Sequence, residues 1–148
     1  SAAVLLPALT SAREKARSIS CMNNMKQVGT GVLMFANDNG MVLPPNLESL
    51  KPYLGPSGDA ALACPSAPSP AGDGPRQDYE YLGAGLKLSE IKQPTQTVIL
   101  VETAARHNRG MNVVFADGHA EYVAATGGQD WRSVAATKGW VVPRPAQP

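Results

Sequence analysis

Residues 1–35 read SAAVLLPALTSAREKARSISCMNNMKQVGTGVLMF and decide the fold of the chain. They contain one proline, Pro7, and two glycines, Gly29 and Gly31, among residues that favour helices. The NDNG that follows at residues 37–40 suits a left-handed helix cap, and the two prolines after it prevent the helix from resuming. The sequence therefore predicts one long helix of roughly 34 residues, about 50 Å in length.

Apolar residues of this helix form two stripes on opposite sides. The first stripe is Leu5, Leu9, Ala12, Ala16 and Ile19. The second stripe is Cys21, Met25, Val28, Val32 and Phe35. One small core cannot cover both sides of a helix, so we expect the second stripe to pack on the chain's own globular part and the first to meet other helices or lipid. The alternative is a curved helix that buries both stripes within a compact monomer.

The remaining composition describes a small head rich in loops. The chain has 148 residues, enough for one domain, and most of its 13 prolines and 14 glycines follow residue 39. Its net charge is only +1, which gives no reason to expect nucleic acid as a partner. We therefore divide the chain into a helix over residues 1–40 and a globular head over residues 41–148.

Alternating segments predict a small antiparallel sheet. Asp117-Gly118 is a signal for a two-residue hairpin turn, which pairs Val114 with Glu121. Residues 97–102, TVILVE, predict a third strand antiparallel to residues 111–116, and residues 46–55 predict a short helix capped by Asn46. In this register the core face carries Met111, Val113, Phe115, Ala120, Tyr122 and Ala124. The other face carries Asn112, Val114, Ala116, His119, Glu121 and Val123.

The fold class that follows is α+β, with one long N-terminal helix packed against an antiparallel sheet of about three strands and a loop-rich middle. We expect the apolar core face of the sheet to pack on the helix.

The two histidines lie close together in the sequence but not in the predicted hairpin. His107 precedes one strand and Asp117 follows it, so about 20 Å of extended chain separates them. We expect His107 to hydrogen-bond a carboxylate or a backbone carbonyl and to fix its loop, and we expect no catalytic residue and no metal ligand. The alternative is a small metal-dependent hydrolase or ion-binding module around His107, Asp117 and His119.

The two cysteines predict a disulfide. Cys21 lies on the inward stripe and Cys64 lies in the loop of residues 55–78, so a bridge would anchor that loop and stabilise the fold by about 4 kcal/mol on an entropic estimate. Two buried free thiols, or a metal or nucleophilic role, are the alternatives. The loop carboxylates Asp59, Asp73 and Asp78 do not follow a calcium-loop pattern, so we expect no cofactor, with calcium as the alternative.

Two segments resemble a known family. LLPALTSAREKARSISCMNNMKQVG, running on to LMFANDNGMVLPP, resembles the exposed half of the first helix of type IV pilin-like proteins, particularly type II secretion pseudopilins. RHNRGMNVVFADGHAEYV is similar to the His-x9-Asp-Gly signature of a prepilin-type branch, with His107, Asp117 and Gly118 in the signature positions. Cys21 and Cys64 also lie where members of that branch commonly carry cysteines. The resemblance covers residues 3–45 and 94–124.

This resemblance implies a structural subunit of a filament and not an enzyme. It implies an inner-membrane-anchored precursor, cleaved and methylated by a prepilin peptidase, whose head faces the periplasm or the cell exterior. The partners would be other pilin-like subunits, which bind through the N-terminal helix, and we expect the cleavage site and the membrane-spanning half to precede Ser1. A binding or adhesion domain on the same pilin scaffold is a further alternative.

Overall fold

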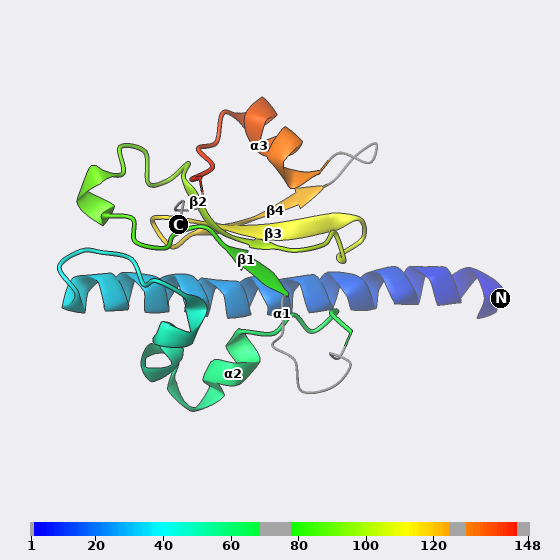
Figure 1. The fold of residues 1–148 in the computed structure, drawn as a ribbon. Coiled ribbons are helices and arrows are strands. Elements are labelled where there is room, and N and C mark those ends of the chain that lie inside the picture. The colour runs from blue at the N-terminus through cyan, green and yellow to red at the C-terminus, as the bar shows by residue number, and fades with distance from the viewer. Residues whose placement is uncertain (1, 69–77, 125–129, 145–148) are drawn as a thin grey trace.

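The computed structural model of the protein describes residues 2–68, 78–124 and 130–144, and it has a long helix lying across a four-stranded antiparallel sheet (Figure 1). Helix α1, Ala2–Asp38, covers one face of the sheet, and a short helix, α3, Trp131–Lys138, covers the other. The predicted α+β class, with a long N-terminal helix on an antiparallel sheet, is confirmed.

Helix α1 ends where the sequence predicts. Gly40 and Met41 adopt positive φ angles of 65° and 64°, and the Met41 amide donates a hydrogen bond of 2.7 Å to the carbonyl of Ala36. This left-handed cap satisfies a terminal carbonyl of the helix and turns the chain back towards the head. None of the helices in the described parts of the chain combines the length and hydrophobicity that crossing a membrane requires.

The sheet is a meander in the order β1-β2-β3-β4, with every neighbouring pair antiparallel. Its strands are β1, Tyr79–Tyr81, β2, Val98–Glu102, β3, Gly110–Phe115, and β4, Ala120–Ala124. The pairing of β2 with β3 follows the prediction. Strand β1 and helix α3 were not predicted. Helix α3 has its own caps, Asp130 at the start and Gly139, with φ of 72°, at the end.

The predicted register of the β3–β4 hairpin is wrong by one residue. Val114 pairs with Ala120 and not with Glu121. The last hydrogen bond before the turn runs from the amide of Phe115, which donates to the carbonyl of His119 at 2.9 Å. The turn therefore has three residues, with Gly118 in the left-handed region at φ of 88°. A three-residue turn ending in a left-handed glycine is the next favoured hairpin geometry after the two-residue turn.

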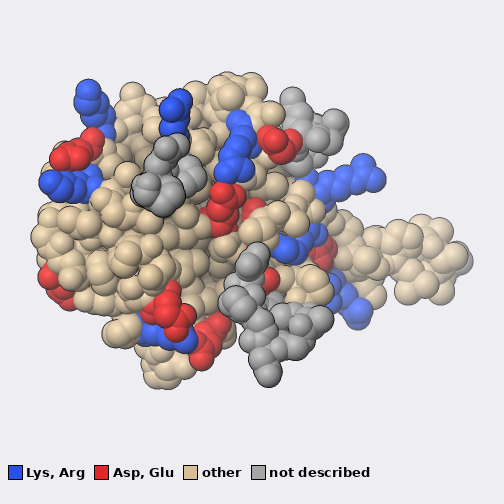
Figure 2. All heavy atoms as spheres, viewed as in Figure 1, with Lys and Arg blue, Asp and Glu red and all other residues tan. Residues whose placement is uncertain are grey.

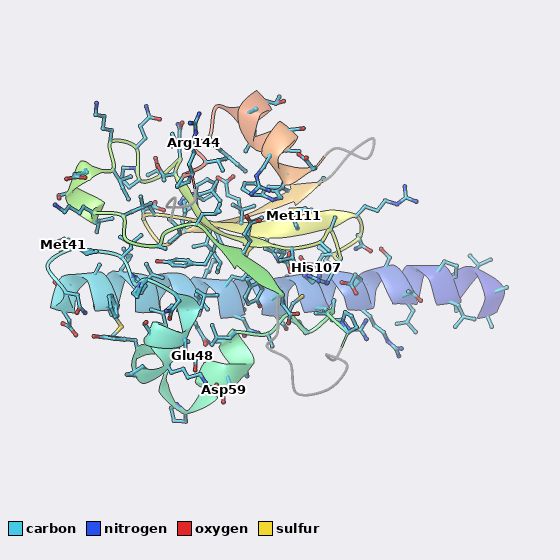
Figure 3. The ribbon with its side chains drawn as sticks, viewed as in Figure 1. Met41, Glu48, Asp59, His107, Met111 and Arg144 are labelled. Atoms are coloured by element: carbon cyan, nitrogen blue, oxygen red, sulfur yellow. The ribbon has the colours of Figure 1, made fainter. Side chains whose placement is uncertain are left out.

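This shift exchanges the two faces of β4, because side chains alternate along a strand. Met111, Val113 and Phe115 pack with Val123 against α3, whereas Val114 and Ala116 pack with α1. The expectation that the Met111 face packs on the long helix is therefore wrong. Figure 3 shows Met111 on the α3 side of the sheet and His107 on the α1 side.

The second stripe of α1 is the seam to the head, as predicted. Cys21, Met25, Val28 and Val32 are buried in one core cluster with residues of β2 and β3, and Phe35 is half-buried beside them. On the opposite side of α1 from the sheet lie short helices: η1, Leu47–Tyr53, η2, Gly55–Ser57, and α2, Gly58–Ala61 (Figure 1). A last turn, η3, Leu88–Glu90, precedes β2. The predicted Asn46 cap of η1 is present, with its side chain accepting from the Ser49 amide.

Candidate functional site

The first stripe of α1 is exposed along its whole length: Leu5 and Leu9 lie on the end of the helix that projects past the head, and Ala16 and Ile19 lie beside the turns that contact the head. Leu5 is 68% exposed, Leu9 47% and Ile19 55%, and Ala12 and Ala16 are exposed as well. A curved helix that buries both stripes within a monomer is therefore excluded. Figure 2 shows this end as a narrow projection with no charged residue at its tip. The protein thus presents an apolar helical surface that its own head does not cover.

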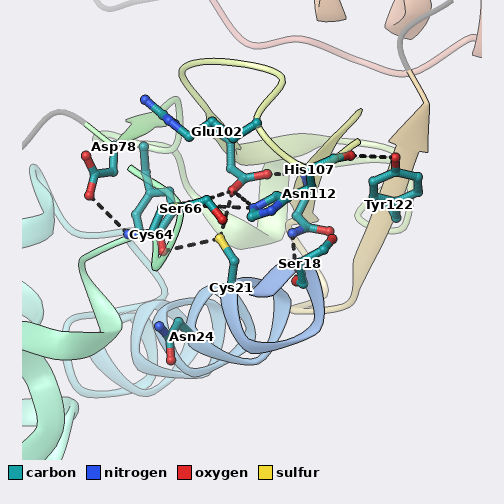
Figure 4. A network of polar contacts seen from close by, with 12 residues as sticks. Ser18, Cys21, Asn24, Cys64, Ser66, Asp78, Glu102, His107, Asn112 and Tyr122 are labelled. Carbon is teal, nitrogen blue, oxygen red and sulfur yellow. Dashed lines mark hydrogen bonds and ion pairs between the residues drawn. The ribbon is translucent and has the colours of Figure 1, made fainter. Parts of the chain in front are cut away.

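A second feature lies at the point where α1 enters the head. Four buried side chains meet there: Cys21 from α1, Cys64 from the segment after α2, Glu102 from the end of β2, and His107 from the β2–β3 loop (Figure 4). One donor atom from each, a sulfur, a carboxylate oxygen or a ring nitrogen, lies within 4.8 Å of the other three. We call these four residues the buried cluster.

Glu102 is the centre of the buried cluster. Its Oε1 accepts from the thiols of Cys21 at 2.8 Å and Cys64 at 3.3 Å and lies 2.7 Å from Nε2 of His107. Its other oxygen, Oε2, accepts from the backbone amide of Asn112 at 2.6 Å. The carboxylate is therefore fully enclosed, with three side-chain groups directed at a single oxygen.

His107 connects the cluster to a more N-terminal turn of α1. Its Nδ1 lies 2.7 Å from Oε1 of Glu14, which also accepts from the Ser66 hydroxyl at 2.7 Å. The expectation that His107 hydrogen-bonds a carboxylate or a backbone carbonyl is confirmed, since its ring contacts two carboxylates. The Tyr122 hydroxyl holds the same loop by donating to the carbonyl of His107 at 2.8 Å.

The contact between the two cysteines lowers the pKa of one thiol, against the opposing effects of burial and of the Glu102 charge. Hydrogen bonding with Cys21 lowers the pKa of Cys64 to about 7, because the partner thiol stabilises the thiolate. The same interaction, with burial, raises the pKa of Cys21. Burial opposes protonation of His107, but the charge of Glu102 and the hydrogen bonds to Glu14 and Glu102 outweigh it and raise the pKa of His107. Such a cluster can bind a metal or undergo thiol chemistry.

The predicted disulfide is not formed. Cys21 and Cys64 are both free and buried, and each thiol donates to Glu102. The sequence correctly placed both cysteines on the helix–loop contact but not the groups around them. Glu14 was missed, although its spacing carries a signal. Glu14, Ser18 and Cys21 are four and three residues apart, which places them on the same inward face of the helix.

The residues of the His-x9-Asp-Gly signature do not converge. His107 forms an isolated bridge with Gly110 at the start of β3, whereas Asp117 and Gly118 form the turn after its other end. The Asp117 carboxylate accepts a hydrogen bond from the amide of His119 and also contacts Nδ1 of its ring. This ring stacks on Phe115 at a centroid distance of 4.4 Å. Among the described residues, the groups that gather around His107 include neither Asp117 nor His119. A hydrolase or ion site built from these three residues is therefore not assembled.

The loop carboxylates are also separated. Asp59 is exposed on α2 near Lys51, whereas Asp78 is buried and its Oδ2 accepts from the Cys64 amide at 3.0 Å. Asp73 lies outside the described residues. Figure 3 places Asp59 well away from His107. Asp59 and Asp78 thus have separate roles, and the two do not form a calcium loop.

Part of the chain is similar to a described protein family. A family described as "Protein of unknown function (DUF1559)" matches residues 10–54, which span most of α1 and all of η1. Neither the curated proteins nor the solved structures include a match to this chain. The family description names no activity.

Proposed function

We propose that the protein is a non-enzymatic structural subunit of a pilus-like filament, a pseudopilin or minor pilin of a type II secretion or type IV pilus-like system. In this proposal the first stripe of α1 packs against the same helix of neighbouring subunits. The observation that carries the proposal is the exposure of Leu5, Leu9 and Ile19 on a helix that extends beyond its own head.

The energetics favour a helical partner for this stripe. Burying a leucine or isoleucine side chain contributes roughly 1.5–3 kcal/mol, so covering Leu5, Leu9 and Ile19 with a partner would favour association. Leu5, Leu9, Ala12, Ala16 and Ile19 recur at intervals of three and four, which is the spacing of one helix seam. The alanines between the larger residues allow a second helix to approach closely.

The signature residues support the same interpretation because they hold the head on the helix. His107 reaches Glu14 of α1, and the turn at Gly118 lies against Gly29, where a Cβ atom would be 3.4 Å from the Gly118 carbonyl oxygen. A signature that fixes the docking of head on helix suits a structural subunit. The proposal includes a membrane-anchored precursor, processing by a prepilin peptidase, and a head in the periplasm or outside the cell.

Site-specific photo-crosslinking tests the proposal in cells that make the full-length protein. A photo-reactive residue replaces Leu9 in one variant and, as the control, the exposed head residue Lys92 in another. We expect position 9 to crosslink to other copies or to other pilin-like subunits, and position 92 not to do so. Equal protein crosslinking at both positions, or adducts at position 9 with lipid alone, would contradict the proposal.

A further inference from the structure

We infer that the buried cluster of Cys21, Cys64, Glu102 and His107 binds a zinc ion that fastens helix α1 to the head. This inference is independent of the filament role, since it concerns how the subunit is held together. It rests on the convergence of four metal-binding side chains from four separate segments of the chain.

The distances suit a tetrahedral ion. The closest donor pairs lie between 2.7 Å, for His107 Nε2 and Glu102 Oε1, and 3.5 Å, for Cys64 Sγ and His107 Nε2. Zinc bonds of about 2.0–2.3 Å place neighbouring ligands about 3.3–3.8 Å apart, so outward side-chain movements of roughly 1 Å or less would admit the ion. No donor of the cluster is more than 4.8 Å from another.

The hydrogen bonding around Glu102 indicates the same centre. Two thiols and a ring nitrogen are directed at the single oxygen Oε1. One carboxylate oxygen offers two lone-pair positions, so the three groups compete for it. An ion between the four groups would replace this crowded arrangement with one bond from each ligand.

The groups behind the ligands are those of a metal site. A histidine ligand commonly donates its second ring N–H to a carboxylate, and His107 has Glu14 at 2.7 Å in that position. The free oxygen of Glu102 accepts from the Asn112 amide, and the Cys64 amide donates to Asp78. The Cys21 sulfur lies 3.6 Å from the Tyr79 hydroxyl, so each of the four ligand residues has a further polar contact, which for Cys64 is made by its backbone.

The ligand chemistry selects zinc. Thiolate and imidazole ligands favour zinc over magnesium or calcium, and a divalent ion offsets two of the three negative charges that two thiolates and a buried carboxylate would carry. Four protein ligands leave no open position for substrate, which is the pattern of a structural zinc site. The helix, the segment after α2, the end of β2 and the β2–β3 loop would then share one ligand centre.

Metal analysis of the untagged protein, purified with zinc and a thiol reductant, tests the inference. We expect one zinc per chain, with two sulfur and two nitrogen or oxygen neighbours in X-ray absorption. Cobalt in place of zinc should give thiolate-to-cobalt charge-transfer absorption. Cys64→Ser and His107→Gln should lose the zinc, and Glu14→Gln should weaken zinc binding about 10- to 100-fold. His119→Gln is the matched control, because it removes the only other histidine and lies outside the cluster.

Several results would overturn the inference. One is zinc-free protein after refolding with excess zinc; another is a Cys21–Cys64 disulfide in protein purified with zinc and reductant. Equal loss of zinc in His119→Gln and His107→Gln would also exclude the site. Should a cluster variant fail to fold, the sulfur count around zinc in the unmodified protein still decides, since fewer than two sulfurs would contradict the assignment.

Discussion

Replacing one buried and one exposed residue of α1 tests whether this helix has two independent faces. Met25 is fully buried against the sheet, so Met25→Ala removes a large side chain from a closed core and should cost roughly 2–5 kcal/mol in the free energy of unfolding. Leu9 is 47% exposed and outside the core, so Leu9→Ala should change stability by no more than about 0.5 kcal/mol. The same helix thus supplies both the perturbation and its control.

Urea denaturation followed by circular dichroism measures both effects. With a slope of about 2 kcal/mol per molar urea, in the middle of the usual range for small proteins, Met25→Ala should lower the midpoint by roughly 1–2.5 M. Val32→Ala is a second buried variant, farther from Cys21, and should cost roughly 2 kcal/mol. Equal destabilisation by Leu9→Ala and Met25→Ala would refute the reasoning, because it would mean that the first stripe also contributes to the fold of the monomer.

Three further substitutions have defined outcomes. Gly29→Val should lower stability by roughly 1–3 kcal/mol in urea denaturation, because a Cβ atom at this position lies 2.9 Å from Cγ1 of Val114. Tyr122→Phe should cost about 0.5–1 kcal/mol in the same assay through the loss of its hydrogen bond to the β2–β3 loop. The Ser133 amide lowers the pKa of Asp130, so its stabilisation is present above the ordinary pKa of 3.8 and is lost as the pH falls through the lowered value. Asp130→Ala should therefore lower the melting temperature at neutral pH, and its difference from the unmodified protein should shrink in acid; a constant difference would contradict this.

The long helix was predictable because its evidence is local and repeated. Each turn of residues 1–35 adds another helix-favouring residue and another position to one of the two stripes, so errors at single positions do not matter. The cap at Gly40 and the strand of residues 98–102 likewise depend on neighbours in the sequence. These are the features that the structure confirms.

The hairpin register was not predictable because Asp117-Gly118 fits two turns. A two-residue turn and a three-residue turn can both end in a left-handed glycine, and the choice decides which face of β4 meets the helix. Here Val114 and Ala116 fill the space over α1, and Phe115 packs in the core shared with α3. The observed register therefore goes together with packing against α3, an element that is distant in the sequence and was not predicted.

The buried cluster was not predictable as a unit because its residues come from four segments. Only Glu102 and His107 are near one another in the sequence, and their contact was partly anticipated. Cys21 and Cys64 lack the close spacing of common zinc motifs, so a disulfide was the simpler expectation. Three-dimensional packing supplied the carboxylate that changes the chemistry of the two thiols.

The exposed first stripe and the buried cluster lie next to each other along α1, which connects the cluster with the proposed filament role. Cys21 is the first fully buried residue of the described part of α1, and before it only Ser18 is buried while Glu14 is partly buried. An isolated helix of 12–15 residues is only marginally stable in water, so the projecting part of α1 gains little from its own turns. Its apolar stripe does not stabilise the head either, since the head does not cover it. In a filament, a force on that stripe would be transmitted to the head at the turn of α1 that carries Cys21. A ligand centre that joins four segments at this turn would distribute the force over the sheet and the loops.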